Sequence, residues 1–121
     1  MSLTDDQCIV AYTSSGAEEL AKKIPEARVV LAFNTVPSVV LFSVYVALGK
    51  ANRPSLVYCG DDRSAKKLAA GLISDVGFDP VDAGPPQIAR YIEPFALLIG
   101  QLAYEGEEGP KLAYHFERFG K

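Results

Sequence analysis

The sequence is poor in cysteine and in basic charge, and both shortages exclude classes of protein. Its two cysteines, Cys8 and Cys59, lie far apart and form no zinc-ligand spacing with the single His115. No metal site and no disulfide scaffold are therefore expected. Twelve Lys and Arg residues stand against fifteen Asp and Glu, a formal net charge of -3, and no basic run is present to neutralise phosphates. Nucleic acid is therefore not an expected partner.

The chain also lacks the local motifs of common nucleotide-binding and hydrolytic enzymes. It contains no G-x-G-x-x-G dinucleotide fingerprint and no G-x-x-x-x-G-K-[ST] phosphate loop. It has no H-E-x-x-H helix, no G-x-S-x-G elbow and no histidine placed to activate a nucleophile. No catalytic residue is therefore assigned from motifs.

The residues that are present suffice for one folded domain. The chain has 121 residues, of which 49% are hydrophobic and 22% charged, as in average soluble globular chains. This length accommodates one core, so a single domain over residues 1–121 is expected. The first residues, MSLTDD, do not resemble a signal peptide, and a cytoplasmic protein with reduced thiols is expected.

One uncharged stretch, residues 29–48, is long enough to cross a bilayer. Asn34 and Pro37 lie in its middle, where a spanning helix would have to carry a polar, proline-broken turn. We favour a strand, a turn and a buried helix instead, and no contact with a membrane is expected.

Apolar periodicity predicts strands that alternate with helices. The predicted strands cover residues 7–12, 28–33, 55–59, 79–83 and 112–116. The predicted helices cover residues 16–24, 38–48, the segment between Asp62 and Gly77, and residues 88–102, where Pro94 is expected to produce a kink. Ser15 and Glu18 form a predicted capping box before the first of these helices. This order predicts a single α/β domain, a three-layer Rossmann-like half-domain with a mostly parallel sheet.

In a parallel sheet, ligands bind at the carboxyl ends of the strands. Three loops are expected to gather there, at residues 34–38, 60–63 and 84–87.

Motifs at these loops follow a specific order. A-F-N-T-V occupies residues 32–36, G-D-D residues 60–62, and F-D-P-V-D-A-G at residue 78 is followed by A-R-Y-I-E, which ends at Glu93. The segment T-S-S-G-A-E-E-L-A-K-K-I-P precedes them from residue 13. In this order and spacing the chain resembles the carboxyl-terminal half of the deazaflavin-dependent NADP reductase family, which is related to the cytosolic domain of the STEAP reductases. The resemblance covers nearly all of residues 13–104.

The chain also departs from the pattern of that family. The amino-terminal half, which carries the glycine fingerprint and reads the adenosine phosphate of NADP in the family, is absent. Pro86 stands where the family usually has Leu, and Leu31 replaces a basic residue before the A-F-N turn. A fragment of a longer protein and a stand-alone relative that completes its sheet with another chain are both compatible with these departures.

The resemblance implies a cofactor role for seven residues. Asn34, Thr35, Val36 and Pro37 match the turn that lies beside the nicotinamide and the deazaflavin, whereas the alternative is a plain turn in which Asn34 or Thr35 caps a helix. Gly84, Pro85 and Arg90 match a stretch in which a glycine permits close approach and an arginine binds an anion.

For Gly84, Pro85 and Arg90 the structural alternative is the start of a helix in which Arg90 pairs with Glu93. Asp61 and Asp62 are expected to cap a helix, Cys59 to pack in the core, and His115 to have no role.

The resemblance thus implies an NADP-dependent oxidoreductase that contributes the substrate-side half of a hydride-transfer site, with a deazaflavin as co-substrate. Such a site needs orientation and exclusion of water more than an acid or a base. Little activity is expected from the chain alone, and two alternatives stay open for its cofactor: NADP with a deazaflavin as co-substrate, or none in the isolated chain. The alternative is a non-catalytic dimerisation or binding module. The expected partner is a second copy of the chain or a separate amino-terminal half, because bare strand edges and apolar faces need cover.

Overall fold

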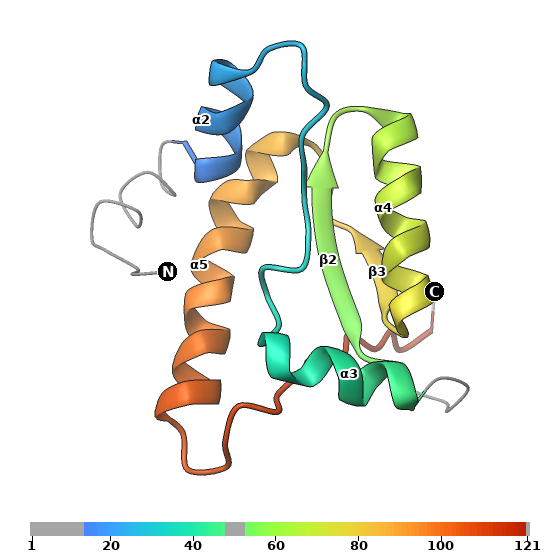
Figure 1. Ribbon diagram of the computed structural model, residues 1–121, viewed down its shortest axis with the longest axis vertical. Coiled ribbons are helices and arrows are strands. Elements are labelled where there is room, and N and C mark those ends of the chain that lie inside the picture. The colour runs from blue at the N-terminus through green and yellow to red at the C-terminus, as the bar shows by residue number, and fades with distance from the viewer. Residues whose placement is uncertain (1–13, 48–52, 121) are drawn as a thin grey trace.

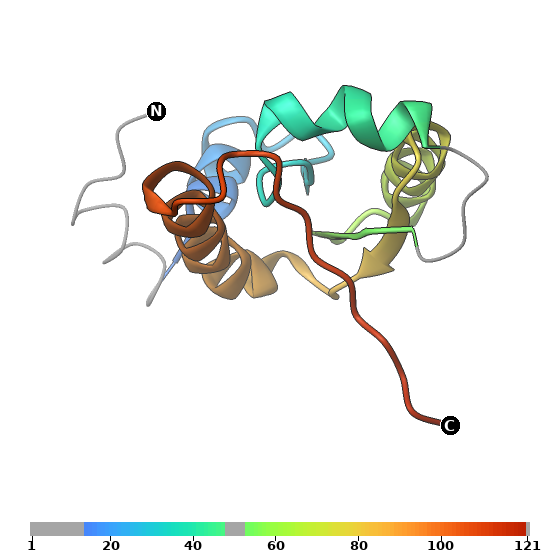
Figure 2. The same ribbon diagram turned by 90° about the horizontal axis from the view of Figure 1, so that it is seen from below.

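The computed structural model describes residues 14–47 and 53–120. Within them, a small sheet lies between two pairs of helices (Figures 1 and 2). The strands are β1 (Val30–Leu31), β2 (Ser55–Gly60) and β3 (Asp79–Asp82). The α-helices are α2 (Gly16–Lys23), α3 (Ser38–Val46), α4 (Arg63–Val76) and α5 (Ala89–Gly100). A 3-10 turn, Pro86–Ile88, precedes α5, and a π-helical segment, Gln101–Glu105, follows it. The predicted strand at residues 7–12 lies outside the described residues.

The sheet is mixed, with the strand order β1-β2-β3. β2 and β3 run parallel, with Ser55 opposite Asp79. β1 runs antiparallel to β2, with Val30 opposite Gly60, because the chain leaves α2 and enters β1 at the carboxyl end of β2 (Figure 1). The predicted α/β architecture is therefore confirmed, whereas the prediction of a mostly parallel sheet is not. β1 keeps only two residues of the strand predicted at 28–33.

β2 is buried on both faces, which gives the fold its three layers. Successive side chains of a strand point to opposite faces, so β2 divides its side chains between two apolar clusters. Leu56 and Tyr58 pack with residues of α3 and α4. Val57 and Cys59 pack against the first turn of α5 and the start of α2. β2 therefore lies between two helical layers, as the three-layer prediction requires, and the predicted packing role of Cys59, which is 1% exposed, is confirmed.

Side-chain caps start two of the helices where the sequence predicts them. The Ser15 hydroxyl accepts a hydrogen bond from the Glu18 backbone N–H at 3.0 Å, and α2 begins at the next residue. A carboxylate oxygen of Asp62 accepts from the Ala65 N–H at 2.8 Å and caps α4. The predicted capping role of Asp62 is therefore confirmed.

Gly77 ends α4 with φ of 122°, a value that favours glycine. A Cβ atom at this position would lie 2.9 Å from the backbone oxygen of Val44 in α3. Glycine at this position therefore allows α4 to turn into β3 directly against α3.

The last third of the chain forms a long helix and an extended tail. α5 continues through Pro94 to Gly100, as the periodicity predicts, and then changes to π-helical geometry. The strand predicted at 112–116 is wrong, because only Tyr114 reaches the edge of β2, where it forms an isolated antiparallel bridge with Ser55. Beyond this bridge the tail leads away from the body (Figure 2).

The outer edge of β3 lacks one backbone donor. The N–H groups of Asp79 and Ala83 bond to backbone oxygens next to and within β2, at 2.8 Å each. Alternation along the strand therefore places the backbone nitrogen of Pro80 on the outer edge. Proline has no N–H to offer there, and proline in a strand is confined to such edges.

None of the helices in the described residues is long and apolar enough to span a bilayer. Residues 29–47 of the uncharged stretch contain β1, a turn and α3.

Candidate functional site

The first predicted site, the turn of Asn34, Thr35, Val36 and Pro37, joins β1 to α3 (Figure 1). Thr35, Val36 and Pro37 are buried. The side-chain oxygen Oδ1 of Asn34 is also buried and has no hydrogen-bond partner in the described part of the chain. Native structures pair nearly all such atoms, so an unpaired one requires an explanation.

The residue before this turn is strained. Phe33 has φ of 63°, a left-handed conformation that is an outlier for a bulky residue. A conformation of this kind costs about 1–3 kcal/mol and is found preferentially at functional sites. The strain at Phe33 and the unpaired oxygen of Asn34 therefore mark the same turn.

The hydroxyl of Thr35 already has a hydrogen-bond partner within the fold. This hydroxyl lies 2.6 Å from the hydroxyl of Tyr114, which also accepts the Val57 backbone N–H at 3.0 Å. Burial raises the pKa of Tyr114, so its hydroxyl stays protonated at neutral pH. Sequence analysis did not identify Tyr114, since alternation in the tail indicates burial but not a hydrogen-bond partner.

The second predicted site, around Gly84, lies where β2 and β3 end. The backbone oxygen of Gly84 accepts from the Gly60 N–H and from Lys66 Nζ, both at 3.2 Å. Lys66 also pairs with Asp82 at 2.8 Å, and this hydrogen bond lowers the pKa of Asp82. The predicted loops at 60–63 and 84–87 therefore meet at the carboxyl edge of the sheet. Pro85 follows Gly84 and precedes the 3-10 turn.

The first predicted turn does not join the other two loops. Because β1 runs antiparallel to β2, the chain after Leu31 moves back along β2 and away from Gly60. Thr35 is linked through Tyr114 to Val57, in the middle of β2. The expectation that all three loops gather at one edge is therefore wrong, because it assumed that β1 was parallel.

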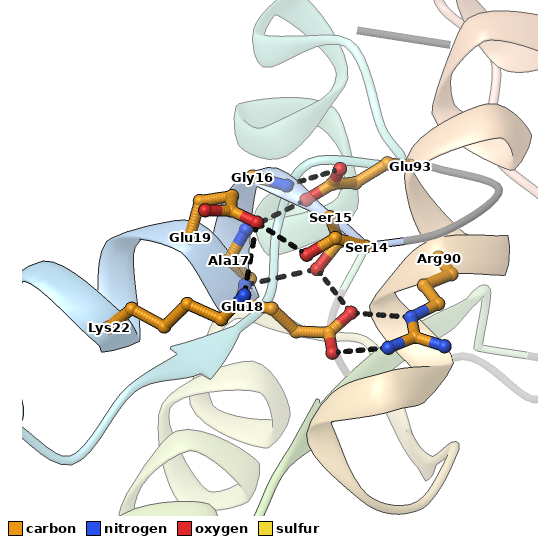
Figure 3. Close-up of polar contacts among 9 residues, drawn as sticks. All are labelled: Ser14, Ser15, Gly16, Ala17, Glu18, Glu19, Lys22, Arg90 and Glu93. Carbon is orange, nitrogen blue, oxygen red and sulfur yellow. Dashed lines mark hydrogen bonds and ion pairs between the residues drawn. The ribbon is translucent and has the colours of Figure 1, made fainter. Parts of the chain in front are cut away.

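Arg90 binds a carboxylate across the α2–α5 interface (Figure 3). Its Nε and Nη2 atoms donate to the two carboxylate oxygens of Glu18 at 2.9 and 3.0 Å. This two-point hydrogen bond lowers the pKa of Glu18 and raises that of Arg90. The predicted pair of Arg90 with Glu93 is wrong, because each side chain bonds to α2 rather than to its neighbour on α5. An anionic ligand at Arg90 would have to compete with Glu18.

Glu93 instead binds the start of α2 (Figure 3). Its carboxylate oxygens accept the backbone N–H groups of Gly16 at 2.9 Å and of Ala17 at 3.1 Å. Free N–H groups and the helix dipole favour a negative charge at this end of a helix. The start of α2, which could otherwise bind an anion, is thus occupied by a carboxylate of the same chain.

A pocket of about 260 Å³ lies between α2, β1 and the carboxyl end of β2. Its lining is mostly small and apolar, with Asp61 as the one side chain that carries a charge. The lining residues are Ala17, Ala21, Pro25, Ala27, Val29, Leu31, Cys59, Gly60, Asp61 and Pro86. None of the seven predicted cofactor residues contributes to it. Burial raises the pKa of the Cys59 thiol, which is therefore protonated and unreactive at neutral pH.

The described residues contain no group of three or more His, Cys, Asp and Glu side chains that could hold a metal ion. His115 lies at the surface with Nδ1 2.9 Å from the backbone oxygen of Arg53.

Comparison with known proteins places the chain among reductases. No family model matches it. The metalloreductase STEAP3 of Rattus norvegicus is 33% identical over 86 residues, which make up 71% of this chain. A solved structure of a proposed F420-dependent NADP reductase from Arthrobacter sp. FB24 superposes on 88% of the chain with a TM-score of 0.75 and 24% identity. A hypothetical protein from Sinorhizobium meliloti superposes on 84% with a TM-score of 0.53 and 27% identity.

The chain spans only part of each of these proteins. It corresponds to 17% of the length of STEAP3, 47% of the Arthrobacter chain and 43% of the Sinorhizobium chain. STEAP3 was found by sequence comparison and the Arthrobacter structure by structural comparison. These two proteins represent the two groups that the motifs predict. The chain thus corresponds to part of a domain of the group that comprises the deazaflavin-dependent NADP reductases and the STEAP metalloreductases.

Proposed function

We propose that the chain is the substrate-side part of an NADP-dependent oxidoreductase of the deazaflavin-dependent reductase type. The observation that carries this proposal is the turn after β1. It matches the family motif, Phe33 is strained before it, and Asn34 Oδ1 is buried without a partner. The hydroxyl of Thr35 next to it, by contrast, has a hydrogen-bond partner in the hydroxyl of Tyr114. A retained, unpaired acceptor beside a strained residue favours a ligand-binding turn over a purely structural one.

Bound NADP would supply the hydride, and this chain's residues would orient it and exclude water. Asn34, Thr35, Val36 and Pro37 would form one wall of that site, and Gly84, Pro85 and Arg90 would contribute from the carboxyl edge of the sheet. Since these two groups lie apart along β2, a second polypeptide would have to complete the site. We propose that a separate amino-terminal half or a second copy of the chain has that role. We also propose that the protein is cytoplasmic and that this chain alone shows little turnover.

A second candidate function is a non-catalytic dimerisation or binding module. Two specific contacts favour it. The guanidinium of Arg90 donates to the carboxylate of Glu18, and the first N–H groups of α2 donate to the carboxylate of Glu93. In this interpretation both anion-binding groups are used to hold α2 on α5, and no cofactor binds.

Calorimetric titration of the chain with NADPH, alone and with a deazaflavin, separates the two candidates. The reductase proposal predicts weak, saturable binding that Asn34→Ala weakens about tenfold or more, the loss expected when one well-placed polar contact is removed. Gln101→Ala, at an exposed position beyond α5, is the matched control and leaves binding unchanged.

No heat with either ligand would favour the binding module. Rapid NADPH oxidation by the chain alone would contradict the proposal that this chain supplies only part of the site, because such activity would require no second polypeptide.

A further inference from the structure

The tail of the chain leads away from the body (Figure 2), and two phenylalanines in it, Phe116 and Phe119, are exposed. Its base is fixed at the start of β2, because the Ser55 N–H donates to the Tyr114 backbone oxygen at 2.7 Å and the Phe116 N–H donates to Ser55 Oγ at 2.9 Å. Phe119, near the tip, is 93% exposed. Leaving a phenyl ring in water at the end of an extended segment is unfavourable, since a buried aromatic ring contributes a large apolar area.

The pocket beside α2 offers the complementary surface. It is lined by alanine, proline, valine and leucine side chains at about 260 Å³, and Asp61 contributes a carboxylate. Asp61 makes no ion pair with the described residues. Arg118 precedes Phe119 in the tail, so the tail offers an aromatic ring with an adjacent cation, and the pocket is apolar with an adjacent anion.

The tail cannot fill the pocket of its own chain. Phe116 is tied to Ser55, whereas the pocket is bounded by Cys59, Gly60 and Asp61 at the other end of β2. At roughly 3.3 Å per residue the two ends of β2 lie about 17 Å apart. The three residues from Phe116 to Phe119 span at most about 10 Å, and they lead away from the sheet.

We propose that Phe119 inserts into this pocket on a second copy of the chain, and that the second copy returns the same contact. A twofold dimer satisfies this arrangement, because each copy gives one tail and one pocket. Leu20 on α2 and Ile24, the residue that follows its end, are exposed close in sequence to the lining residues Ala21 and Pro25, and they offer further apolar surface to an arriving tail.

The two inserted rings bury about 150–250 Å² each, well below the roughly 1,200 Å² typical of a stable interface. The dimer is therefore weak and depends on protein concentration. The inference is independent of the proposed reductase role, since no predicted cofactor residue lines the pocket.

Sedimentation equilibrium of the full 121-residue chain over a concentration series tests the proposal. The expected result is a reversible monomer–dimer equilibrium whose dissociation constant rises at least about tenfold in Phe119→Ala, as for a buried aromatic anchor. Phe42→Ala is the matched control, because Phe42 is exposed on α3 and no residue of α3 lines the pocket, and it leaves the equilibrium unchanged.

Disulfide trapping gives a second readout that does not depend on affinity. In Phe119→Cys with Asp61→Cys and Cys8→Ser, the new thiol of the tail would reach the exposed thiol at position 61 beside the pocket of the other copy, and mild oxidation would give a covalent dimer. Restoring Asp61 should abolish that dimer, which separates it from a chance link between two exposed tail cysteines.

A chain that stays monomeric at all concentrations would overturn the proposal. So would a dimer that Phe42→Ala dissociates and Phe119→Ala does not, because α3 would then be the contact. A covalent dimer that persists when Asp61 is restored would equally place the tail elsewhere.

Discussion

At the scale of single residues, a few polar side chains hold together segments that are distant in the sequence. Tyr114 bonds to Val57, 57 positions away, and Glu93 bonds to Gly16, 77 positions away. Helix geometry makes an i,i+3 pair such as Arg90 with Glu93 predictable, because only local spacing matters. The pairs that do form depend on how α2 docks on α5. The residues of the candidate site could therefore be predicted from motifs, but their partners could not.

Tyr114 gives the first residue-scale prediction. Tyr114→Phe removes the acceptor of the Val57 N–H and the partner of Thr35 without changing the ring. Buried polar groups left without partners cost about 1–3 kcal/mol, and we expect the free energy of unfolding in urea to fall by that amount. Tyr104→Phe, at an exposed position, should leave stability unchanged. Equal stability of the two variants would mean that the Tyr114 hydroxyl contributes nothing.

Glu18 gives a pH-dependent prediction. Its pKa is lower in the folded chain than in the unfolded one because of the hydrogen bond with Arg90. The pair therefore stabilises the fold above the ordinary glutamate pKa of about 4.3, and that contribution is lost as the pH falls through the lowered value. We expect Glu18→Gln to unfold more easily than the natural chain at pH 7, and the difference to shrink at lower pH.

Denaturant unfolding of both chains between neutral and acidic pH measures this difference. Glu26→Gln is the control, since Glu26 is exposed and forms no ion pair within the described residues. A difference that is constant with pH would show that the loss at Glu18 is not electrostatic.

At the scale of elements, caps and periodicity predict the helices well, and the sheet less well. Ser15 and Asp62 fix where α2 and α4 begin, since a capping bond joins residues only three positions apart. Strand direction depends on where the connecting loop returns the chain, and apolar runs carry no such information. β1 was therefore expected to be longer and parallel, and the tail was expected to form a strand because its alternation fits a half-buried edge.

The end of α4 gives a prediction with a control in the same helix. Gly77→Ala would place a Cβ atom 2.9 Å from Val44 O at φ of 122°, so we expect a loss of about 1–3 kcal/mol in unfolding free energy. Gly71→Ala, where a Cβ meets open space in the helix interior, should instead gain about 0.5–1 kcal/mol. Thermal unfolding of both variants measures the two signs, and a stabilising Gly77→Ala would contradict the account of this helix end.

At the scale of the whole molecule, much apolar surface is left uncovered. α3 contains no charged residue, and while Val40 and Val44 face the core, Val39, Phe42 and Val46 are exposed. A helix that is apolar on every side is normally buried. Such a surface is consistent with a unit that spans less than half of its solved relatives.

The two proposals about partners can be separated at this scale. Phe119→Ala should weaken association, and it should leave NADPH binding unchanged where a separate amino-terminal half completes the cofactor site, because no residue of the Asn34 turn lines the pocket. Asn34→Ala should weaken NADPH binding without changing association. A variant that changes both measurements would indicate that the pocket and the cofactor site are coupled.

Because Pro80 lies on the outer edge of β3, the two edges of the sheet differ in how well they can accept an added strand. A strand added beside β3 would find a missing donor, with carboxylates of Asp79 and Asp82 on either side in the sequence. A strand added beside β1 would meet no such obstacle. A designed strand intended to extend this sheet should therefore be directed to β1 rather than to β3.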